Sequence, residues 1–356
     1  MTGLEVTEQV ILRPVDFSQL DGWADDDHAA AFRAFLNSCR VAPHSEAVAA
    51  AALAADALAL DETLDDAAAR AFFEVHFVPH AVEAKEPGLV TGYYEPEVHG
   101  AHAPGDRFGV PVYGRPDDLI TRAGETERAR FNDRVTGFRA IPDGEVPYHS
   151  RAEIDDGALE GRGLALLYLD DAVDLFYMQV QGSGLVHLDD GTAKRLTYAG
   201  KNGHPYTSIG KVLIARGELS ADEIDMDRVK AWLRADEVRG RALMQENVSY
   251  VFFRALSEEE GRDGPRGAAG VSLTPGRSLA IDTAHHGLGT PVFVTAAGLK
   301  TDGGQPFRRL MIGQDVGSAI SGSQRGDIFW GTGEGAGAIA GSTRHNARFH
   351  VLLPKR

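Results

Sequence analysis

Apolar residues in the first part of the chain recur at spacings of three and four, the period of a helix face. The pattern covers residues 25–40, 45–60 and 61–77, and it ends near Pro79. Ser45 is a candidate N-cap of the second segment, because its hydroxyl can accept a hydrogen bond from a free backbone N–H. The apolar positions of the first segment are Phe32, Phe35, Leu36 and Cys39. We therefore expect three helices, with Cys39 in their apolar core.

Residues 89–97 form a short strand-like run, Leu-Val-Thr-Gly-Tyr-Tyr-Glu-Pro-Glu, which is broken by Pro96. Two adjacent tyrosines offer flat faces to sugar C–H groups and hydroxyls that can orient a ligand. An edge strand with half-buried tyrosines explains the same run. The pattern alone does not choose between a binding site and a sheet edge.

Residues 164–169 and 173–181 predict two buried strands. In the second, alternation separates two faces. One face carries Phe176, Met178 and Val180, and the other carries Tyr177, Gln179 and Gln181. Gly182-Ser183-Gly184 follows directly, and neutral hydrogen-bonding groups beside an open turn suit a polyhydroxylated ligand. A solvated strand face is the alternative interpretation.

The second half of the chain changes from helical to strand-like patterning. Residues 198–206 are a loop rich in donors, Thr207 or Ser208 can cap the helix that follows, and residues 225–244 have helical period. In that last segment Val229, Trp232 and Leu233 are in register. Short apolar runs punctuated by turns then occupy 279–282, 291–294, 310–315, 328–330 and 349–353. Strands with no helix between them favour a small β-barrel over a sheet of β-α units.

Three acids stand at the ends of these late apolar runs: Asp282, Asp315 and Asp327. The stretch 308–341 that holds the last two is also rich in glycine, which allows close approach of a ligand to the backbone. Carboxylates at strand ends among glycines indicate a catalytic or binding site. Turn acids at a sheet edge are the alternative.

Composition narrows the classes of function. The chain has 356 residues, a net charge of −16, 43% hydrophobic residues and one cysteine. These values are typical of a globular protein of about two domains. The acidic balance argues against nucleic-acid binding, which requires a basic face, and one cysteine excludes an internal disulfide framework. We see no apolar run of about 20 residues that could cross a membrane and no signal peptide.

Three motif resemblances to cofactor and metal sites are rejected. Residues 335–340, Gly-Ala-Gly-Ala-Ile-Ala, imitate a dinucleotide fingerprint but lack an acid about 20 residues further on. His99 and His102 have no evident third ligand, and His285 and His286 point to opposite sides of an extended chain. We expect no metal and no cofactor.

Four separated segments resemble the membrane-bound lytic transglycosylase A family, whose members cleave bacterial peptidoglycan. The residues after about 270 resemble the C-terminal module named for three aspartates. The resemblance covers most of the chain from about Trp23 onward, and the four segments occur in the family's order. They are Thr91-Gly92-Tyr93-Tyr94-Glu95-Pro96, Gln179-Val180-Gln181-Gly182-Ser183-Gly184, Gly200-Lys201-Asn202-Gly203-His204-Pro205-Tyr206 and Asn247-Val248-Ser249-Tyr250-Val251-Phe252-Phe253.

The resemblance implies a mainly β fold with N-terminal helices. A double-psi β-barrel domain would be formed from both chain ends, residues 1–108 and 247–356, with the three-aspartate module at about 270–353. A smaller β-barrel domain, residues 109–246, would be inserted in it, and glycan would bind in the groove between them.

The resemblance also implies roles for individual residues. Asp327 takes the position of the family's catalytic acid, with Asp315 and Asp282 in supporting catalytic positions. The segment between Asp315 and Asp327 looks about one residue longer than in the family, so the turn there can differ. We expect glycan-binding residues at Thr91, Gly92, Tyr93, Tyr94, Glu95, Gln179, Gln181, Gly182, Ser183, Gly184, Lys201, Asn202, Tyr206 and Trp330.

The chemistry expected of Asp327 can be argued from first principles. Cleavage of a glycosidic bond needs an acid on the leaving oxygen and, in most enzymes, a second carboxylate. A lytic transglycosylase instead lets the muramyl 6-hydroxyl attack its own anomeric carbon, which gives a 1,6-anhydro product. Asp327 would need a raised pKa, which burial beside Phe329 and Trp330 and the charge of Asp315 would supply.

Three other functions stay open. An inverting glycosidase could use Asp327 and Asp315 on cell-wall glycan. Asp282-Thr283-Ala284 and Asp315-Val316-Gly317 imitate the paired signature of aspartic peptidases, although that reading leaves the tyrosine and glutamine segments unexplained. A non-catalytic cell-wall-binding protein would bind glycan without releasing product.

The resemblance implies a periplasmic protein associated with the outer membrane, although no lipid-anchor cysteine is visible. Its partners would be peptidoglycan glycan strands and other cell-wall enzymes. We expect a monomer.

Overall fold

The computed structural model describes residues 11–40, 46–59, 64–84, 87–122, 135–222, 224–301 and 303–355. The chain divides into two compact units. The first consists of Met1–Tyr94, Arg266–Gly331 and Gly335–Arg356, and the second of Glu95–Pro265 and Thr332–Glu334. The second unit extends beyond the expected 109–246 on both sides, because strands outside that range pair with strands inside it.

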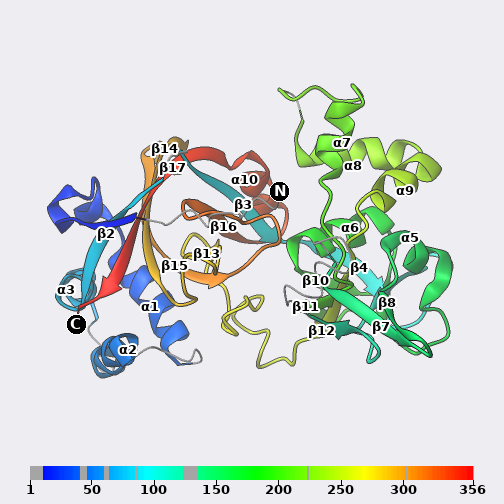
Figure 1. The fold of residues 1–356 in the computed structure, drawn as a ribbon, viewed down its shortest axis with the longest axis horizontal. Coiled ribbons are helices and arrows are strands. Elements are labelled where there is room, and N and C mark those ends of the chain that lie inside the picture. Colours follow the sequence, from blue (N-terminus) through cyan, green and yellow to red (C-terminus); the bar gives the residue numbers. More distant parts are fainter. Residues whose placement is uncertain are drawn as a thin grey trace. The chain divides into compact units, whose positions relative to one another are not determined.

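The first unit is built on a closed barrel (Figure 1). Its strands are β3 (Gly88–Glu95), β13 (Ser278–Ile281), β14 (Pro291–Lys300), β15 (Pro306–Asp315), β16 (Arg325–Thr332) and β17 (Arg344–Pro354). The hydrogen-bonded order is β17-β14-β15-β13-β16-β3, and β3 pairs back with β17. β2 (Phe77–Glu83) and β1 (Ile11–Pro14) continue the sheet from β17. The barrel takes strands from both parts of the chain that flank the second unit, as expected for the double-psi fold.

Three helices pack beside this barrel: α1 (His28–Cys39), α2 (Glu46–Ala59) and α3 (Asp66–His76). Phe32, Phe35 and Phe73 are almost fully buried, in a cluster that includes Phe293 and Leu310 of the barrel. Aromatic side chains at helical spacing therefore supply the contact with the sheet.

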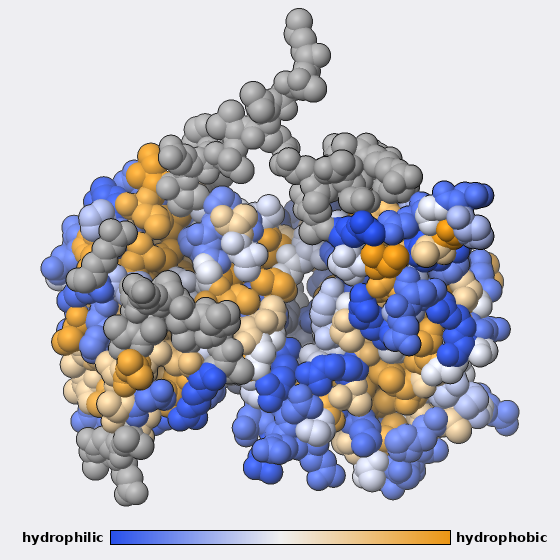
Figure 2. Space-filling model, turned by 60° about the horizontal axis from the view of Figure 1, so that its bottom comes forward, coloured by the Kyte–Doolittle hydropathy of each residue, from blue (hydrophilic) through white to orange (hydrophobic). Residues whose placement is uncertain are grey.

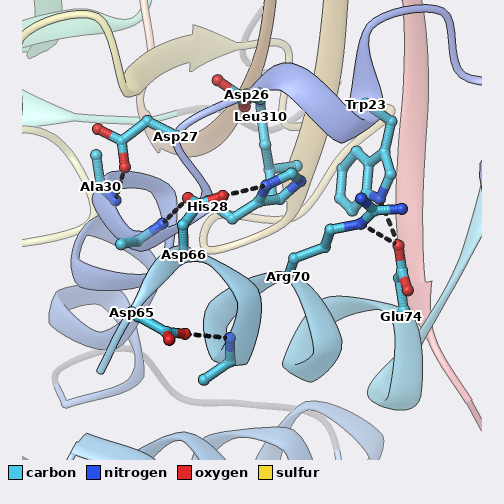
Figure 3. Close-up of polar contacts among 12 residues, drawn as sticks. Trp23, Asp26, Asp27, His28, Ala30, Asp65, Asp66, Arg70, Glu74 and Leu310 are labelled. Carbon is cyan, nitrogen blue, oxygen red and sulfur yellow. Dashed lines mark hydrogen bonds and ion pairs between the residues drawn. The ribbon is translucent and has the colours of Figure 1, made fainter. Parts of the chain in front are cut away.

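The helical part of the sequence prediction is confirmed over the described residues. Cys39 is half-buried and packs against the edge of the same cluster, and burial raises the pKa of its thiol to about 12. Ser45, the candidate cap of α2, lies outside the described residues. Asp27 caps α1 by accepting from the Ala30 N–H, and Asp65 caps α3 by accepting from the Ala68 N–H (Figure 3).

Polar contacts tie the N-terminal segment, including η2 (Trp23–Asp25), to other elements of the unit. The Trp23 indole N–H donates to Glu74 at 2.9 Å, and Glu74 also accepts from Arg70 (Figure 3). Asp26 accepts two hydrogen bonds at 2.9 Å from the guanidinium of Arg277 and one at 2.6 Å from the Leu310 N–H. Asp26 and Arg277 are both buried. A buried charge is stable only when it is paired in this way.

A second buried polar group, Gln314 near the end of β15, binds α1. Its side-chain N–H groups donate to the carbonyl of Ala34 and the hydroxyl of Ser38, each at 2.8 Å. Its side-chain carbonyl accepts from Ser278 Oγ. Gln314, Ser38 and Ser278 have no exposed surface. The network fixes one end of β15 against the helix.

We expected no helix between the C-terminal strands. This is wrong, because α10 (Glu334–Ser342) lies between β16 and β17. Its residues are small, and Gly337 lies so close to the ring of Tyr94 that a Cβ there would be 2.9 Å from the ring. The run of small residues that imitates a nucleotide motif therefore permits close helix packing in this unit.

The second unit has a sheet in the order β12-β11-β10-β4-β9-β5. The strands are β4 (Glu97–Ala101), β5 (Val110–Tyr113), β9 (Ala165–Leu169), β10 (Ser183–Leu188), β11 (Ala193–Lys201) and β12 (Val251–Ala255). A bridge between Gly114 and Phe253 links the two edges of this sheet, as expected for a small barrel. β6 (Ile120–Thr121), β7 (Gly137–Ile141) and β8 (Gly144–Pro147) form a separate small sheet.

The strand predicted at 173–181 is wrong, because these residues lie in α6 (Ala172–Gln181). Asp171 caps the helix by accepting from the Val173 N–H, and Gly182 ends it with a φ of 85°. Both faces that alternation had separated contain buried residues, including Phe176, Tyr177 and Met178. A short apolar run cannot be assigned to strand or helix from its period alone.

Among the described residues of this unit, the remaining helices are α5 (Arg151–Glu153), the π-helical turn η3 (Ile154–Ala158), α7 (Ile209–Ala215), α8 (Met226–Ala235) and α9 (Glu237–Gln245). Ser208 caps α7 as expected. The single helix predicted over 225–244 is two helices, because the chain is extended at Asp236, which caps α9.

Hydrophilic residues predominate on the face shown in Figure 2, with hydrophobic residues in smaller groups between them. None of the helices in the described ranges has both the length and the apolar character needed to cross a membrane.

Candidate active site

Two of the three predicted acids flank one residue of the barrel, Ala280 on β13. β13 pairs with β16 on one side, where Ala280 is opposite Asp327, and with β15 on the other, where Ala280 is opposite Asp315. Ala280 is only 3% exposed and packs in a small cluster with Tyr93 and Phe329. Strand register therefore brings together two acids that are separated by a turn in the sequence.

Asp327 is held by a hydrogen bond from β3. Thr91 Oγ1 donates to Asp327 Oδ1 at 2.5 Å, and Arg325 Nη2 donates to the same Thr91 oxygen at 2.8 Å. Burial raises the pKa of Asp327 to about 6, and the charge of Asp315 acts in the same direction. The Thr91 hydrogen bond and the Arg325 charge oppose the rise. A carboxyl with this pKa can deliver a proton near neutral pH.

Asp315 accepts more hydrogen bonds than Asp327 does. Tyr93 Oη donates to Asp315 Oδ2 at 2.9 Å, and the backbone N–H groups of Ala268 and Val316 donate to Oδ1 at 2.9 Å. Burial raises the pKa of Asp315, while these three donors favour the charged form. The same burial and the neighbouring carboxylate raise the pKa of Tyr93 well above its usual value. Tyr93 therefore stays protonated and acts as a donor.

Asp282 has a different environment from the other two acids. It follows β13 and accepts from the backbone N–H groups of Ala284 and Gly322 at 3.0 and 2.7 Å. Burial alone would raise its pKa, but these two donors, together with His285 and His286, outweigh burial and the pKa is lowered. An ionised carboxylate that caps two backbone groups orders its loop, and it has no proton to donate near neutral pH.

Aromatic rings support the acid pair from β3 and β16. Tyr93 packs on Phe329 with 5.3 Å between ring centroids, and Trp330 packs on Phe307 at 6.0 Å. Gly92 lies against the indole of Trp330, and a Cβ there would be 2.6 Å from its Nε1. Within the described residues this N–H has no hydrogen-bond partner. Of the predicted site residues, Thr91 and Tyr93 contact the acids, whereas Gly92 and Trp330 pack against each other.

Tyr94 and Glu95, also predicted to bind glycan, are buried. The ring of Tyr94 packs against α10. Glu95 has no exposed surface and accepts from Arg195 Nε at 2.9 Å and from Thr332 Oγ1 at 2.7 Å. Burial raises the pKa of Glu95, although Thr332 and Arg195 oppose the rise. Neither side chain is available to a ligand in this conformation.

Gln179 and Asn202 of the second unit are likewise buried and unavailable to a ligand. Gln179 is 4% exposed and donates to the Val251 carbonyl. Asn202 has no exposed surface and makes four hydrogen bonds to backbone groups, among them the carbonyls of His149 and Val248 at 2.9 Å. These amides connect loops of the unit to each other.

The Gly182-Ser183-Gly184 turn also has a packing role. Gly182 ends α6, Ser183 is buried, and a Cβ on Gly184 would overlap the sulfur of Met178. Gln181, at the end of α6, keeps partial exposure.

Two other predicted binding residues of the second unit also keep accessible surface. The ring of Tyr206 is 39% exposed. Lys201, the last residue of β11, is partly buried, which lowers the pKa of its ammonium group. They are the best candidates in this unit for direct contact with a polyhydroxylated ligand.

No group of three or more potential ligands in the described residues could hold a metal ion. His286 binds the Ser323 carbonyl at 2.6 Å, and His285 lies 3.8 Å from Asp282. The carboxyls of the acid pair can transfer protons.

Sequence reasoning missed Arg325 and the backbone donor at Ala268. Arg325 lies two residues before Asp327, so both side chains are on the same face of β16, and that spacing could have revealed it. The Ala268 N–H belongs to a loop 47 residues away from Asp315 in sequence. No local pattern marks such a contact.

Comparisons with known proteins agree with this architecture. The family model described as the MltA specific insert domain matches residues 89–254, and that of the 3D domain matches residues 277–353. A membrane-bound lytic murein transglycosylase A from Vibrio cholerae is 37% identical over 269 residues, which are 74% of this chain and 65% of that protein. The chain thus aligns with about two thirds of the length of this relative.

Solved structures extend the similarity to nearly the whole chain. A membrane-bound lytic murein transglycosylase from Agrobacterium tumefaciens is 36% identical with a TM-score of 0.86, covering 96% of this chain and 97% of that one. Escherichia coli MltA with bound chitohexaose is 30% identical with a TM-score of 0.69, covering 97% and 92%. The chain belongs to the membrane-bound lytic murein transglycosylase A (MltA) family.

Proposed function

We propose that the protein is a peptidoglycan lytic transglycosylase that uses Asp327 as its single catalytic acid and base. It cleaves the β-1,4 bond between N-acetylmuramic acid and N-acetylglucosamine and leaves a 1,6-anhydromuramyl end. The observation that carries the proposal is the Asp327–Asp315 pair beside Ala280, with the pKa of Asp327 raised to about 6. The names of its relatives support the substrate class.

The first step uses the protonated form of Asp327. Its proton moves to the glycosidic oxygen, the bond from that oxygen to muramyl C1 breaks, and the anomeric carbon becomes electron-deficient. The N-acetylglucosamine leaves as a free 4-hydroxyl. Burial, with the negative charge of Asp315 acting in the same direction, keeps Asp327 protonated at higher pH than a solvent-exposed aspartate.

The second step uses the carboxylate that remains. The muramyl 6-hydroxyl attacks C1 and gives its proton to Asp327, which restores the acid. No water is consumed, so the two products together have the mass of the substrate. One carboxyl is sufficient because the nucleophile, the 6-hydroxyl, belongs to the sugar and no second carboxylate is needed.

The ligand of one relative and the accessible residues of this chain both support a glycan substrate. The E. coli structure carries chitohexaose, a neutral oligosaccharide. We propose that the exposed Tyr206 and the partly exposed Lys201 and Thr91 contribute to glycan binding. The buried residues Glu95, Gln179 and Asn202 support the fold around it.

The site of action follows from the substrate. Peptidoglycan lies outside the cytoplasmic membrane, and the curated relatives are named as membrane-bound. We propose that the protein works in the periplasm, associated with the outer membrane, with glycan strands as its main partner.

Purified sacculi and mass spectrometry test the proposal. The wild type should release fragments with 1,6-anhydromuramyl ends, each about 18 Da lighter than the corresponding hydrolysis product because no water is added. Asp327→Asn should reduce release by at least a hundredfold, since an amide cannot donate this proton. Circular dichroism and sacculus binding should stay at wild-type values.

Two results would contradict the proposal. Near-wild-type lysis by Asp327→Asn would remove this residue from catalysis. Products with a reducing muramyl end would favour the inverting hydrolase, in which Asp315 activates a water molecule.

A further inference from the structure

The hydroxyl of Thr91 lies between a cation and an acid. Arg325 Nη2 donates to Thr91 Oγ1 at 2.8 Å, and Thr91 Oγ1 donates to Asp327 Oδ1 at 2.5 Å. The three residues come from two neighbouring strands of the barrel, β3 and β16. This chain of contacts was not anticipated by any sequence motif.

The chemistry of the two ends determines the direction of both hydrogen bonds. A guanidinium carries donors only, so Arg325 must donate and the Thr91 oxygen must accept. A threonine hydroxyl has one hydrogen, and it is then directed to Asp327. Oδ1 of Asp327 therefore receives a hydrogen bond whether the carboxyl is charged or neutral.

We propose that Arg325 is a positioning residue that fixes Thr91 as a donor to Asp327 Oδ1 and so assigns the acid proton to Asp327 Oδ2. This inference rests on the proposed function, in which Asp327 is the acid. Asp327 Oδ2 is then the oxygen that exchanges the proton with the glycosidic oxygen and later with the muramyl 6-hydroxyl.

Several charged groups act on this chain of contacts. Asp315 on β15 raises the pKa of Asp327, and Arg325 on β16 lowers it. Tyr93 on β3 stays neutral and donates to Asp315. Arg344 on β17 lowers the pKa of Arg325, in addition to the larger effect of burial. The guanidinium also donates to the Gly326 carbonyl, which holds it along its own strand.

Loss of Arg325 has two consequences. The positive charge that stabilises the Asp327 carboxylate disappears, and the Thr91 hydroxyl can rotate away from Oδ1. Both changes favour the protonated form of Asp327, so its titration midpoint should rise. Turnover should fall as well, because the proton is no longer confined to one oxygen.

The experiment follows Asp327 directly by ¹³C NMR of the aspartate carboxyls in the full-length protein, with the signal assigned by its absence in Asp327→Asn. Arg325→Met should raise the midpoint by about one pH unit, and the alkaline limb of the lysis profile should move up by the same amount. Turnover at its optimum should fall about tenfold. Arg325→Lys, which keeps a charge and a donor, should return both midpoints towards wild type.

Thr91 gives an independent variant if Arg325→Met does not fold. Thr91→Val removes the hydroxyl at nearly constant volume and should also raise the midpoint, whereas Thr91→Ser should not. Adding Arg325→Met to Thr91→Val should raise the midpoint by less than Arg325→Met does alone, because the two residues act through one contact. Arg348→Met, which removes an exposed arginine of β17, is the matched control for loss of charge.

An unchanged midpoint in Arg325→Met and in Thr91→Val would overturn the inference, and so would strict additivity of the two changes. The NMR titration does not depend on lysis, so this outcome is distinct from failure of the proposed function. A lytic Asp327→Asn would contradict the function alone.

Discussion

Gln314 and Asp315 are consecutive residues at the end of β15, yet they serve opposite sides of the strand. Gln314 is buried against α1, where every polar atom of its side chain has a partner from the same chain. Asp315 faces Tyr93 and the neighbourhood of Asp327. Alternation along a strand therefore separates a residue that fixes the strand from one that tunes an acid.

This difference shows that a buried polar residue can either stabilise the fold or take part in function. At Gln314, as at Asp26 and Asn202, complete hydrogen bonding indicates a contribution to the architecture. At Asp327, burial and the like charge of Asp315 raise the pKa of the carboxyl, and a single hydroxyl donor opposes the rise only in part. Perturbed groups of the second kind are the ones that point to function.

The largest expected effect concerns stability on the α1 side. Arg277→Met should lower the free energy of unfolding by about 3–5 kcal/mol, because the Asp26 carboxylate would remain buried without its cation. Urea unfolding measures the change. Arg13→Met, which breaks the exposed pair with Glu83, should cost less than about 1 kcal/mol. Equal effects of the two variants would mean that burial of the pair is unimportant.

Gln314→Leu should have the next largest effect, about 2–3 kcal/mol, since the Ser278 and Ser38 hydroxyls and the Ala34 carbonyl would lose their partner. The pH midpoint of lysis should stay at the wild-type value below the melting temperature. A shifted midpoint would break the comparison, since it would show that the α1 side also tunes the acid.

Asp315→Asn should change stability by less than about 1 kcal/mol and change the pH profile instead. The negative charge of Asp315 adds to the effect of burial in raising the pKa of Asp327, so its removal lowers that pKa. Because the protonated form of Asp327 starts the reaction, the alkaline limb of activity moves to lower pH. Turnover at pH 8 should therefore fall. A limb that moves upward would contradict this assignment.

Much of the fold could be predicted from the sequence. The N-terminal helices follow from clear helical periodicity, and the five late strands follow from short apolar runs punctuated by turns. The strand predicted at 173–181 was wrong because a ten-residue apolar run fits both periods, and only the Asp171 cap and Gly182 decide for a helix. The division of 225–244 into α8 and α9 likewise depends on one extended residue, Asp236.

The candidate site was predictable in part. Asp315 and Asp327 stand out at strand ends, but their common neighbour Ala280 follows only from the register of β13 with both strands. The sequence located the polar residues of the four family segments, but it did not show which of them contact a ligand and which are buried. Whether Gln179, Asn202 or Glu95 faces a ligand or the interior depends on tertiary packing, which local sequence does not encode.

The connectivity of the barrel has a consequence for how the protein acquires its structure. β3 and β17 pair across more than 240 positions of sequence, Thr91 with Arg344 for example, and the barrel closes only through that contact. The second unit is almost entirely one continuous segment, Glu95–Pro265. During synthesis or export, that segment can become structured while β3 waits for its partner. The two acids can therefore meet their β3 partners Thr91 and Tyr93 only after the C-terminal strands have been synthesised.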